Sequence, residues 1–386
     1  MKGRKLKIVY CTPSLYIAGG VERVLTQKAN YLADVLGYDV TIVLTDGKDK
    51  PLFYPLSEKI RVVNLGIDFD ELWAHSFLGQ IVPYLRKQRV YRSRLRELLL
   101  EIRPDITVSL LRREINFLTS IGDGSRKVGE LHVNRKKYRY YEANNTNIVK
   151  EVFAWFWMKN LIGHLRRLDR FVVLTEEDRR AWPEVEGVVA IADPLPFFPD
   201  RRSPLTAKRV IAVGRYEYQK GFDLLLRAWA MIERQCPDWR LDVFGHGERE
   251  AYEELIGQLG VDRSRCRLNG PTDHIQEEYL NSSVFAFSSR YEGFGMVLIE
   301  AMACGIPAVS FDCPCGPKDI IRDGEDGFLV TTGDVEAFSK ALLTVIQDSA
   351  LRERMGANAR RNVKRFEMKE IAGQWERLFG ELIIEN

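Results

Sequence analysis

The sequence predicts an α/β protein of two doubly wound domains, each with a parallel sheet covered by helices on both faces. Its 386 residues exceed what one ordinary hydrophobic core organises and suit two domains. Short apolar segments bounded by charged residues alternate with helical segments along the chain, which is typical of parallel sheets. A proline-rich segment, 193–199, separates a first series of alternations from a second.

The first series begins near the amino terminus. Segment 8–12 is interpreted as a buried strand and not as part of a signal peptide, because the apolar run is short and Lys7 interrupts it. The next apolar segments are short and bounded by charges, as buried strands are. The predicted elements are strands at 8–12, 39–44, 105–110 and 170–174 and a helix at 20–36.

The segment 193–199 is predicted to be a stiff linker, because its three prolines can continue neither a helix nor a central strand. The second series then follows. It comprises strands at 209–214, 239–245, 284–288 and 308–311, helices at 222–234, 248–259, 296–304 and 335–347, and one helical segment at 351–386. The expected domains are 1–195 and 196–365, with 366–386 as a helix that packs back on the first domain. Ligands bind such folds outside the carboxyl ends of the strands, so we expect a cleft between the domains.

Composition describes a globular protein, with 45% hydrophobic and 29% charged residues. Residues 1–200 carry 32 Lys and Arg against 25 Asp and Glu, which favours either an anionic surface or substrate, or simply a solvated basic face. Six scattered cysteines indicate reduced thiols, and their spacing predicts no metal site. No run of about 18 apolar residues occurs, so no membrane-spanning helix is predicted.

The strongest motif spans residues 290–307. Gly293 and Gly295 let the backbone turn tightly before a predicted helix, whose N-terminus suits a phosphate. Glu292 and Glu300 can each accept two hydrogen bonds from a vicinal diol such as a ribose or sugar edge. The alternative is an ordinary helix end with two solvated glutamates, but the helix around Glu300 is apolar, which disfavours it.

Two further loops are candidate anion sites. Arg215 and Lys220 follow a predicted strand, and their combination suits a pyrophosphate, although two surface charges would also explain them. Gly19 and Gly20 precede a predicted helix and can bring backbone N–H groups to an anion. They form neither a dinucleotide fingerprint nor a Walker loop.

Together these segments resemble the family 4 retaining glycosyltransferases, which have the GT-B fold of two facing Rossmann-like domains. The resemblance spans nearly the whole chain. It rests on the Gly-Gly loop near residue 20, the Gly-Arg…Lys-Gly segment at 214–221, the Glu-x7-Glu element at Glu292 and Glu300, and the segments 312–317 and 323–330.

The resemblance implies a role for each site residue. Arg215 and Lys220 would hold the donor diphosphate, Glu300 the ribose and Glu292 the transferred sugar. His132 would contact the donor sugar or the acceptor, because 130–134 resembles a Glu-His-x-Asn stretch with Leu131 inserted, although a lone histidine is otherwise more often structural. The remaining implied contacts come from Gly19 and Gly20 at the diphosphate, from the backbone of Gly293, Phe294 and Gly295 at the phosphate and sugar, and from the backbone near Thr272 at the nucleobase.

The activity so implied is metal-independent hexosyl transfer with retention of configuration and without a cofactor. The donor would be a nucleoside diphosphate sugar, with uridine as the default base, and the acceptor a glycan or lipid-linked molecule in bacterial polysaccharide assembly. The leaving phosphate would take the acceptor proton in a front-face displacement. The expected location is the cytoplasm, with peripheral attachment to the inner face of the membrane as an option.

Alternatives remain open at this point. The chain could be a non-catalytic sugar-nucleotide-binding partner subunit or a same-fold epimerase, although intact Arg215, Lys220, Glu292 and Glu300 argue against a decayed site. The basic stretches 85–96 and 134–141 and the aromatic run 153–158 could form a patch that docks on anionic lipid. Equally, the aromatic run could be a buried helix and the cations solvated. A nucleic-acid role is not expected, because no recognised module is present.

Overall fold

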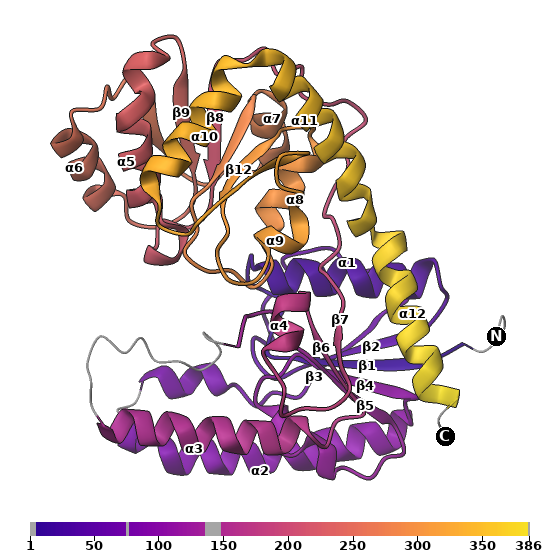
Figure 1. Ribbon diagram of the computed structural model, residues 1–386. Helices are drawn as coiled ribbons and strands as arrows, with labels where there is room; N and C mark the ends of the chain where they lie inside the picture. The colour runs from indigo at the N-terminus through magenta and orange to yellow at the C-terminus, as the bar shows by residue number, and fades with distance from the viewer. Residues whose placement is uncertain (1–4, 75–76, 136–147, 385–386) are drawn as a thin grey trace. The chain divides into compact units, whose positions relative to one another are not determined.

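The computed structural model describes residues 5–74, 77–135 and 148–384, and it divides the chain into two units. The first unit comprises Met1–Pro194 and Met368–Asn386, and the second comprises Leu195–Glu367. Each unit has a parallel sheet with helices around it (Figure 1). The predicted class of two Rossmann-like α/β domains is confirmed.

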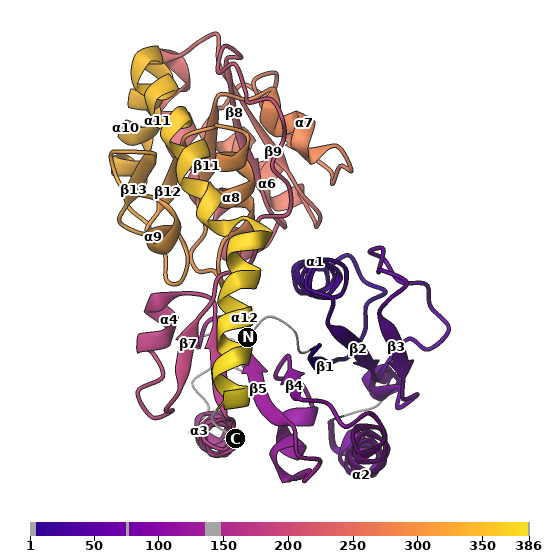
Figure 2. The ribbon, with the colours of Figure 1, turned by 90° about the vertical axis from the view of Figure 1, so that its right-hand side faces the viewer.

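In the described residues, the first unit forms a sheet of seven strands in the order β3-β2-β1-β4-β5-β6-β7. Its central strands are buried, because apolar residues cover both faces. Figure 2 shows α1 on one side of the strands and α2 and α3 on the other. The elements are β1 (Lys7–Thr12), α1 (Gly20–Asp34), β2 (Asp39–Leu44), β3 (Arg61–Asn64), α2 (Phe77–Ile102), β4 (Ile106–Ser109), β5 (Arg126–Glu130), α3 (Ile148–Leu165), β6 (Arg170–Val173), α4 (Glu176–Arg180), β7 (Val188–Ala190) and α12 (Met368–Ile384).

The second unit forms a sheet in the order β10-β9-β8-β11-β12-β13, and all its paired strands are parallel. Helix α5 packs with α6 and with α10, and α8 packs with α9 and α11. Its core gathers around Trp229, Phe311 and Phe338. The elements are β8 (Arg209–Val213), α5 (Phe222–Ile232), β9 (Arg240–Phe244), α6 (Glu250–Leu259), β10 (Cys266–Asn269), α7 (Ile275–Leu280), β11 (Val284–Phe287), α8 (Met296–Ala303), β12 (Ala308–Phe311), α9 (Pro317–Ile320), β13 (Gly327–Val330), α10 (Val335–Gln347) and α11 (Ser349–Asn362).

The described part of the segment 351–386 is helical, as expected, but it is interrupted. Helix α11 ends at Asn362, a 3-10 turn follows, and Glu367 is extended with φ −56° and ψ 145° before α12 begins. At this break the carbonyl of Phe366 accepts the N–H of Leu195, a linker residue, at 2.7 Å. The two helices therefore belong to different units.

In each sheet the chain first adds strands on one side of the first strand and then on its other side. Strand β1 therefore lies between β2 and β4, and β8 lies between β9 and β11. Loops that leave the carboxyl ends of such neighbouring strands diverge and leave space for a ligand. The two sheets thus each place one pair of loops at a switch point. Within the described residues, no helix is both long and apolar enough to span a membrane.

Candidate functional site

Lys220 and Glu292 meet at the switch point of the second unit. The loop after β8 carries Lys220, and the loop after β11 carries Glu292. The Nζ atom of Lys220 lies 2.7 Å from Oε1 of Glu292, and both side chains are largely buried. The approach depends on Gly221, which has φ 61°, because a Cβ there would lie 2.1 Å from the carbonyl oxygen of Ser288.

Glu292 is fixed by neutral groups as well as by Lys220. The hydroxyl of Ser289 donates to Oε1 at 2.6 Å, and the side-chain amide of Gln219 donates to Oε2 at 3.4 Å. The backbone N–H of Glu292 donates to the carbonyl of Pro314 at 3.1 Å. Several donors on one carboxylate fix its orientation. Sequence reasoning missed Ser289 and Gln219, although both lie directly beside the motifs that it selected.

Arg215 lies on the same loop as Lys220 but is solvent-exposed. Its side chain is 59% exposed and pairs with Glu217 at 3.0 Å. A surface ion pair of this kind contributes little to stability, so Arg215 can exchange its partner for an anion at low cost. Thr272 lies in the loop after β10, at the same edge of the sheet, where its hydroxyl oxygen accepts the N–H of His274 at 3.1 Å.

Glu300 lies inside α8 and is almost completely buried. The hydroxyl of Tyr279, from α7, donates to its Oε2 at 3.2 Å. Burying a carboxylate in an apolar helix is costly, and the burial of Glu300 shows that it is not part of a solvated helix face. The backbone turns at Gly293, Phe294 and Gly295 before α8 begins. Gly295 is the N-cap residue of α8 with φ 107°, and no described side chain forms a capping hydrogen bond there.

The loop after β12 encloses this turn. Gly316 has φ 134°, and a Cβ there would lie 1.8 Å from the carbonyl oxygen of Phe294. The ring of Phe294 is buried against Phe366, so only its backbone faces the turn. Burial, with Glu292 nearby, raises the pKa of the Cys313 thiol, which keeps it neutral. The segment 312–317 therefore holds the backbone of 292–295 in place.

In the first unit, His132 belongs to a buried network of charges. Its ring nitrogens lie 3.1 Å from Glu130 and 3.2 Å from Asp193. Burial disfavours its charged form, but the two carboxylates outweigh this and raise its pKa to about 9. Glu130 also binds Lys28, and this ammonium lies 4.2 Å from the ring centroid of Trp375 in α12. Sequence reasoning found His132 but missed Lys28.

The remaining predicted residues of the first unit lie where the loop after β1 leads into α1. Gly19 precedes α1, and Gly20 is the first residue of this helix. The carboxylate of Glu22 folds over Gly19, in the space that a side chain at residue 19 would occupy. Leu131, which stands between Glu130 and His132 in the sequence, is buried in a hydrophobic core cluster of the unit.

Residues 196–362, nearly the whole second unit, match the family model for glycosyl transferases group 1. The second unit is thus similar to the group 1 glycosyl transferases. Over 379 residues, the chain is 28% identical to an uncharacterized glycosyltransferase of Haemophilus influenzae, which covers 96% of this chain and 99% of that protein. This similarity therefore extends over both units of the chain.

Two further comparisons extend this result beyond the group 1 domain. The chain is 25% identical, over 95% of its length and 96% of the relative, to a Campylobacter jejuni α-1,4-N-acetyl-D-galactosaminyltransferase whose name gives a diNAcBac-PP-undecaprenol-linked acceptor. S. aureus TarM, solved with fondaparinux, α-GlcNAc-glycerol and UDP, matches with a TM-score of 0.76 at 16% identity, over 97% of this chain and 99% of TarM. The predicted GT-B class is therefore confirmed, and the chain has glycosyltransferase homologues in bacterial glycan assembly.

Proposed function

We propose that the protein is a retaining glycosyltransferase of family 4. It moves a hexosyl group from a nucleoside diphosphate sugar, with uridine as the default base, to a glycan or lipid-linked acceptor in bacterial polysaccharide or glycan assembly. The observation that carries this proposal is the Lys220–Glu292 pair at the switch point of a group 1 glycosyltransferase domain, with the buried carboxylate of Glu300 on the adjoining helix.

The donor roles follow from charge and position. Lys220 and Arg215 bind the diphosphate, while Glu300 accepts hydrogen bonds from the ribose hydroxyls. Glu292 contacts the sugar, and the backbone of 293–295 lines the phosphate and the sugar. The loop at Thr272 faces the base. Gly19 and Gly20 bring backbone N–H groups to the diphosphate, and His132 contacts the sugar or the acceptor; these three residues belong to the first unit.

The proposed reaction breaks the bond between the anomeric carbon and the phosphate oxygen. Negative charge develops on the leaving diphosphate, and the cations of Lys220 and Arg215 stabilise it where other enzymes use a metal ion. The acceptor oxygen attacks from the face that the diphosphate leaves, and its proton passes to a phosphate oxygen. Configuration is therefore retained, and the step requires neither a metal nor a cofactor.

Replacing Glu300 by glutamine is expected to weaken binding of the preferred nucleoside diphosphate about 10- to 100-fold, because hydrogen bonds to a charged acceptor are lost. Glutamine can still accept the hydroxyl of Tyr279, so the fold is kept. Calorimetry with a panel of nucleoside diphosphates, without metal, measures the change. The exposed Glu254→Gln variant of the same unit serves as the control. If folded wild-type protein bound none of the nucleotides, the donor assignment would be wrong.

We further propose that the protein works at the cytoplasmic face of the membrane, with α3 as the contact. Leu161 and Leu165 face the core of the unit, whereas Trp155 and Phe156 are 57% and 61% exposed. The alternative that these aromatics lie in a buried helix is therefore wrong for both. A groove of about 390 Å³ beside them is lined by Phe156, Lys159, Asn160, Gly163, His164 and Arg167. Exposed aromatics next to cations suit an anionic lipid surface.

Other parts of the predicted basic patch contribute differently. Residues 136–141 lie outside the described residues, as do the side chains of Phe153 and Ala154. In α2, Lys87 donates to the carbonyl of Asp68 at 2.8 Å, and Arg94 donates to the carbonyl of Gly66 at 3.0 Å. These two cations hold a neighbouring loop and are structural.

Vesicle flotation tests this contact. Wild-type protein is expected to float with phosphatidylglycerol vesicles and not with phosphatidylcholine vesicles. Changing Trp155 and Phe156 together to serine should reduce the bound fraction at least about tenfold, since two exposed aromatic rings no longer enter the interface. Phe53→Ser, which removes another exposed ring from the same unit, should leave flotation unchanged. Equal flotation with both kinds of vesicle would contradict the proposal.

A further inference from the structure

The turn that follows β4, residues 110–114, lies at the switch point of the first unit. Strand β4 pairs with β1 so that Ser109 is opposite Cys11, and the N–H of Leu110 donates to the carbonyl of Cys11 at 3.2 Å. The turn therefore starts beside the loop that leads from β1 to Gly19. Ligands of doubly wound sheets bind at such a point.

A buried carboxylate shapes this turn. Oε1 of Glu114 accepts the hydroxyl of Ser109 at 2.7 Å and the backbone N–H of Arg112 at 3.1 Å. Leu111 has φ 50°, a left-handed conformation that costs a non-glycine residue energy. A buried carboxylate and a strained backbone together hold two adjacent arginines, Arg112 and Arg113, in a defined position.

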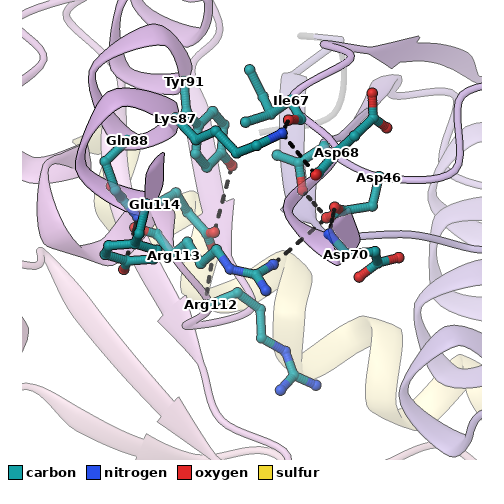
Figure 3. A network of polar contacts seen from close by, with 12 residues as sticks. Asp46, Ile67, Asp68, Asp70, Lys87, Gln88, Tyr91, Arg112, Arg113 and Glu114 are labelled. Atoms are coloured by element: carbon teal, nitrogen blue, oxygen red, sulfur yellow. Dashed lines mark hydrogen bonds and ion pairs between the residues drawn. The ribbon is translucent and has the colours of Figure 1, made fainter. Parts of the chain in front are cut away.

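The two arginines differ in their surroundings (Figure 3). The guanidinium of Arg113 lies 3.6 Å from Asp46 and 4.4 Å from the ring centroid of Phe69, so it is anchored. The guanidinium of Arg112 points away from this pair and is exposed. Within the described part of the chain it has neither an ion pair nor a hydrogen bond. Its five N–H donors are thus available to a ligand.

Nearby carboxylates do not compete for Arg112. Asp46 accepts the hydroxyl of Thr45 at 2.6 Å and the N–H of Asp70 at 3.0 Å, in addition to its pair with Arg113. The carboxylate of Asp70 accepts the hydroxyl of Tyr16 at 2.6 Å. As far as the described residues show, the turn therefore presents one open guanidinium, whose planar fork matches a phosphate.

We propose that Arg112 binds a phosphate group of the acceptor, so that the acceptor class is a phosphate-bearing glycan or glycolipid. This inference rests on the proposed function. It is consistent with the C. jejuni relative, whose name contains a PP-undecaprenol-linked acceptor. The phosphate can belong to a polyprenyl pyrophosphate or to a phosphodiester in a glycan chain. Arg112 adds affinity and selects these acceptors against uncharged sugars.

The test is calorimetry in the presence of saturating UDP, with three probes: geranylgeranyl pyrophosphate, a glycerol phosphodiester oligomer and an uncharged alkyl glucoside. We expect Arg112→Gln to weaken the binding of one phosphate probe about 10- to 100-fold and to leave the binding of the glucoside unchanged. Arg112→Lys should restore part of the affinity, because it keeps the charge but loses the fork. Arg92→Gln, which removes an exposed arginine of α2, is the matched control.

The outcomes separate this inference from the proposed function. If Arg112→Gln weakens binding of the pyrophosphate alone, the acceptor is lipid-linked. If it weakens binding of the oligomer alone, the acceptor is a glycan phosphodiester. Equal binding of both phosphate probes by wild type and Arg112→Gln overturns the role of Arg112. Weaker binding of UDP itself by Arg112→Gln also overturns it, because the arginine would then serve the donor. Failure of the wild type to bind UDP refutes the proposed function instead.

Discussion

Changing Lys220 to methionine is expected to lower kcat/KM for release of the nucleoside diphosphate about 10²- to 10³-fold. The ammonium is proposed to stabilise charge that develops on the leaving diphosphate, and the loss of one such preorganised group has effects of this size. Its position within 2.7 Å of Glu292 shows that it is held at the switch point and does not move freely in solvent. A nucleotide-release assay with the donor identified by binding measures the effect.

Two variants separate catalysis from folding in this experiment. Lys208→Met removes an exposed lysine of the same unit, which pairs with Asp238, and should leave activity unchanged. Lys220→Met also removes a partner of Glu292, so thermal unfolding must be measured in parallel. Ser289 and Gln219 still bind that carboxylate, and we expect the unit to stay folded. A folded Lys220→Met protein with at least a third of normal kcat/KM would contradict the assignment.

Changing Lys28 to methionine is expected to destabilise the first unit by about 3–5 kcal/mol. The side chain of Lys28 is 1% exposed and binds both oxygens of Glu130, so its loss leaves a buried carboxylate without its main counter-charge. The same ammonium contacts Trp375, and α12 loses this contact too. The shift in the midpoint of urea unfolding measures the change.

The double variant Lys28→Met and Glu130→Leu tests the cause. Removing both charges eliminates the unpaired carboxylate, so we expect most of the lost stability to return. Lys59→Met, which removes an exposed lysine paired with Asp34, should change stability by less than about 1 kcal/mol. If Lys28→Met lowered the free energy of unfolding no more than this control, the network would contribute nothing to the stability of the fold.

The elements that the sequence predicted correctly are those whose signal is local. Strands β1, β2, β8 and β12 are buried on both faces, and their apolar runs stand out from the charged residues that bound them. The Glu-x7-Glu element was visible for a similar reason, because Glu300 interrupts an apolar helix.

Most of the strands that sequence reasoning missed lie at the edges of the two sheets. Strands β3, β7, β10 and β13 end the two orders of pairing, and each is short and only partly buried. An edge strand pairs with a neighbour on one side only and is more exposed to solvent than a central strand. Its sequence therefore needs no continuous apolar run. Strand β5 is central but was missed because it contains Lys127 and Glu130, which are buried by pairing with Asp123 and Lys28.

The sequence by itself determined the two-domain α/β architecture and the loops that carry the candidate site, because hydrophobic periodicity and glycine placement act over a few residues. Only the tertiary structure decided which charges meet. Lys220 pairs with Glu292 across 72 residues, and Lys28 pairs with Glu130 across 102. Among the residues that the structure describes, it also leaves the guanidinium of Arg112 without a partner, while Arg113 binds Asp46. Such pairs depend on which strands become neighbours in the sheet, and no local spacing records that choice.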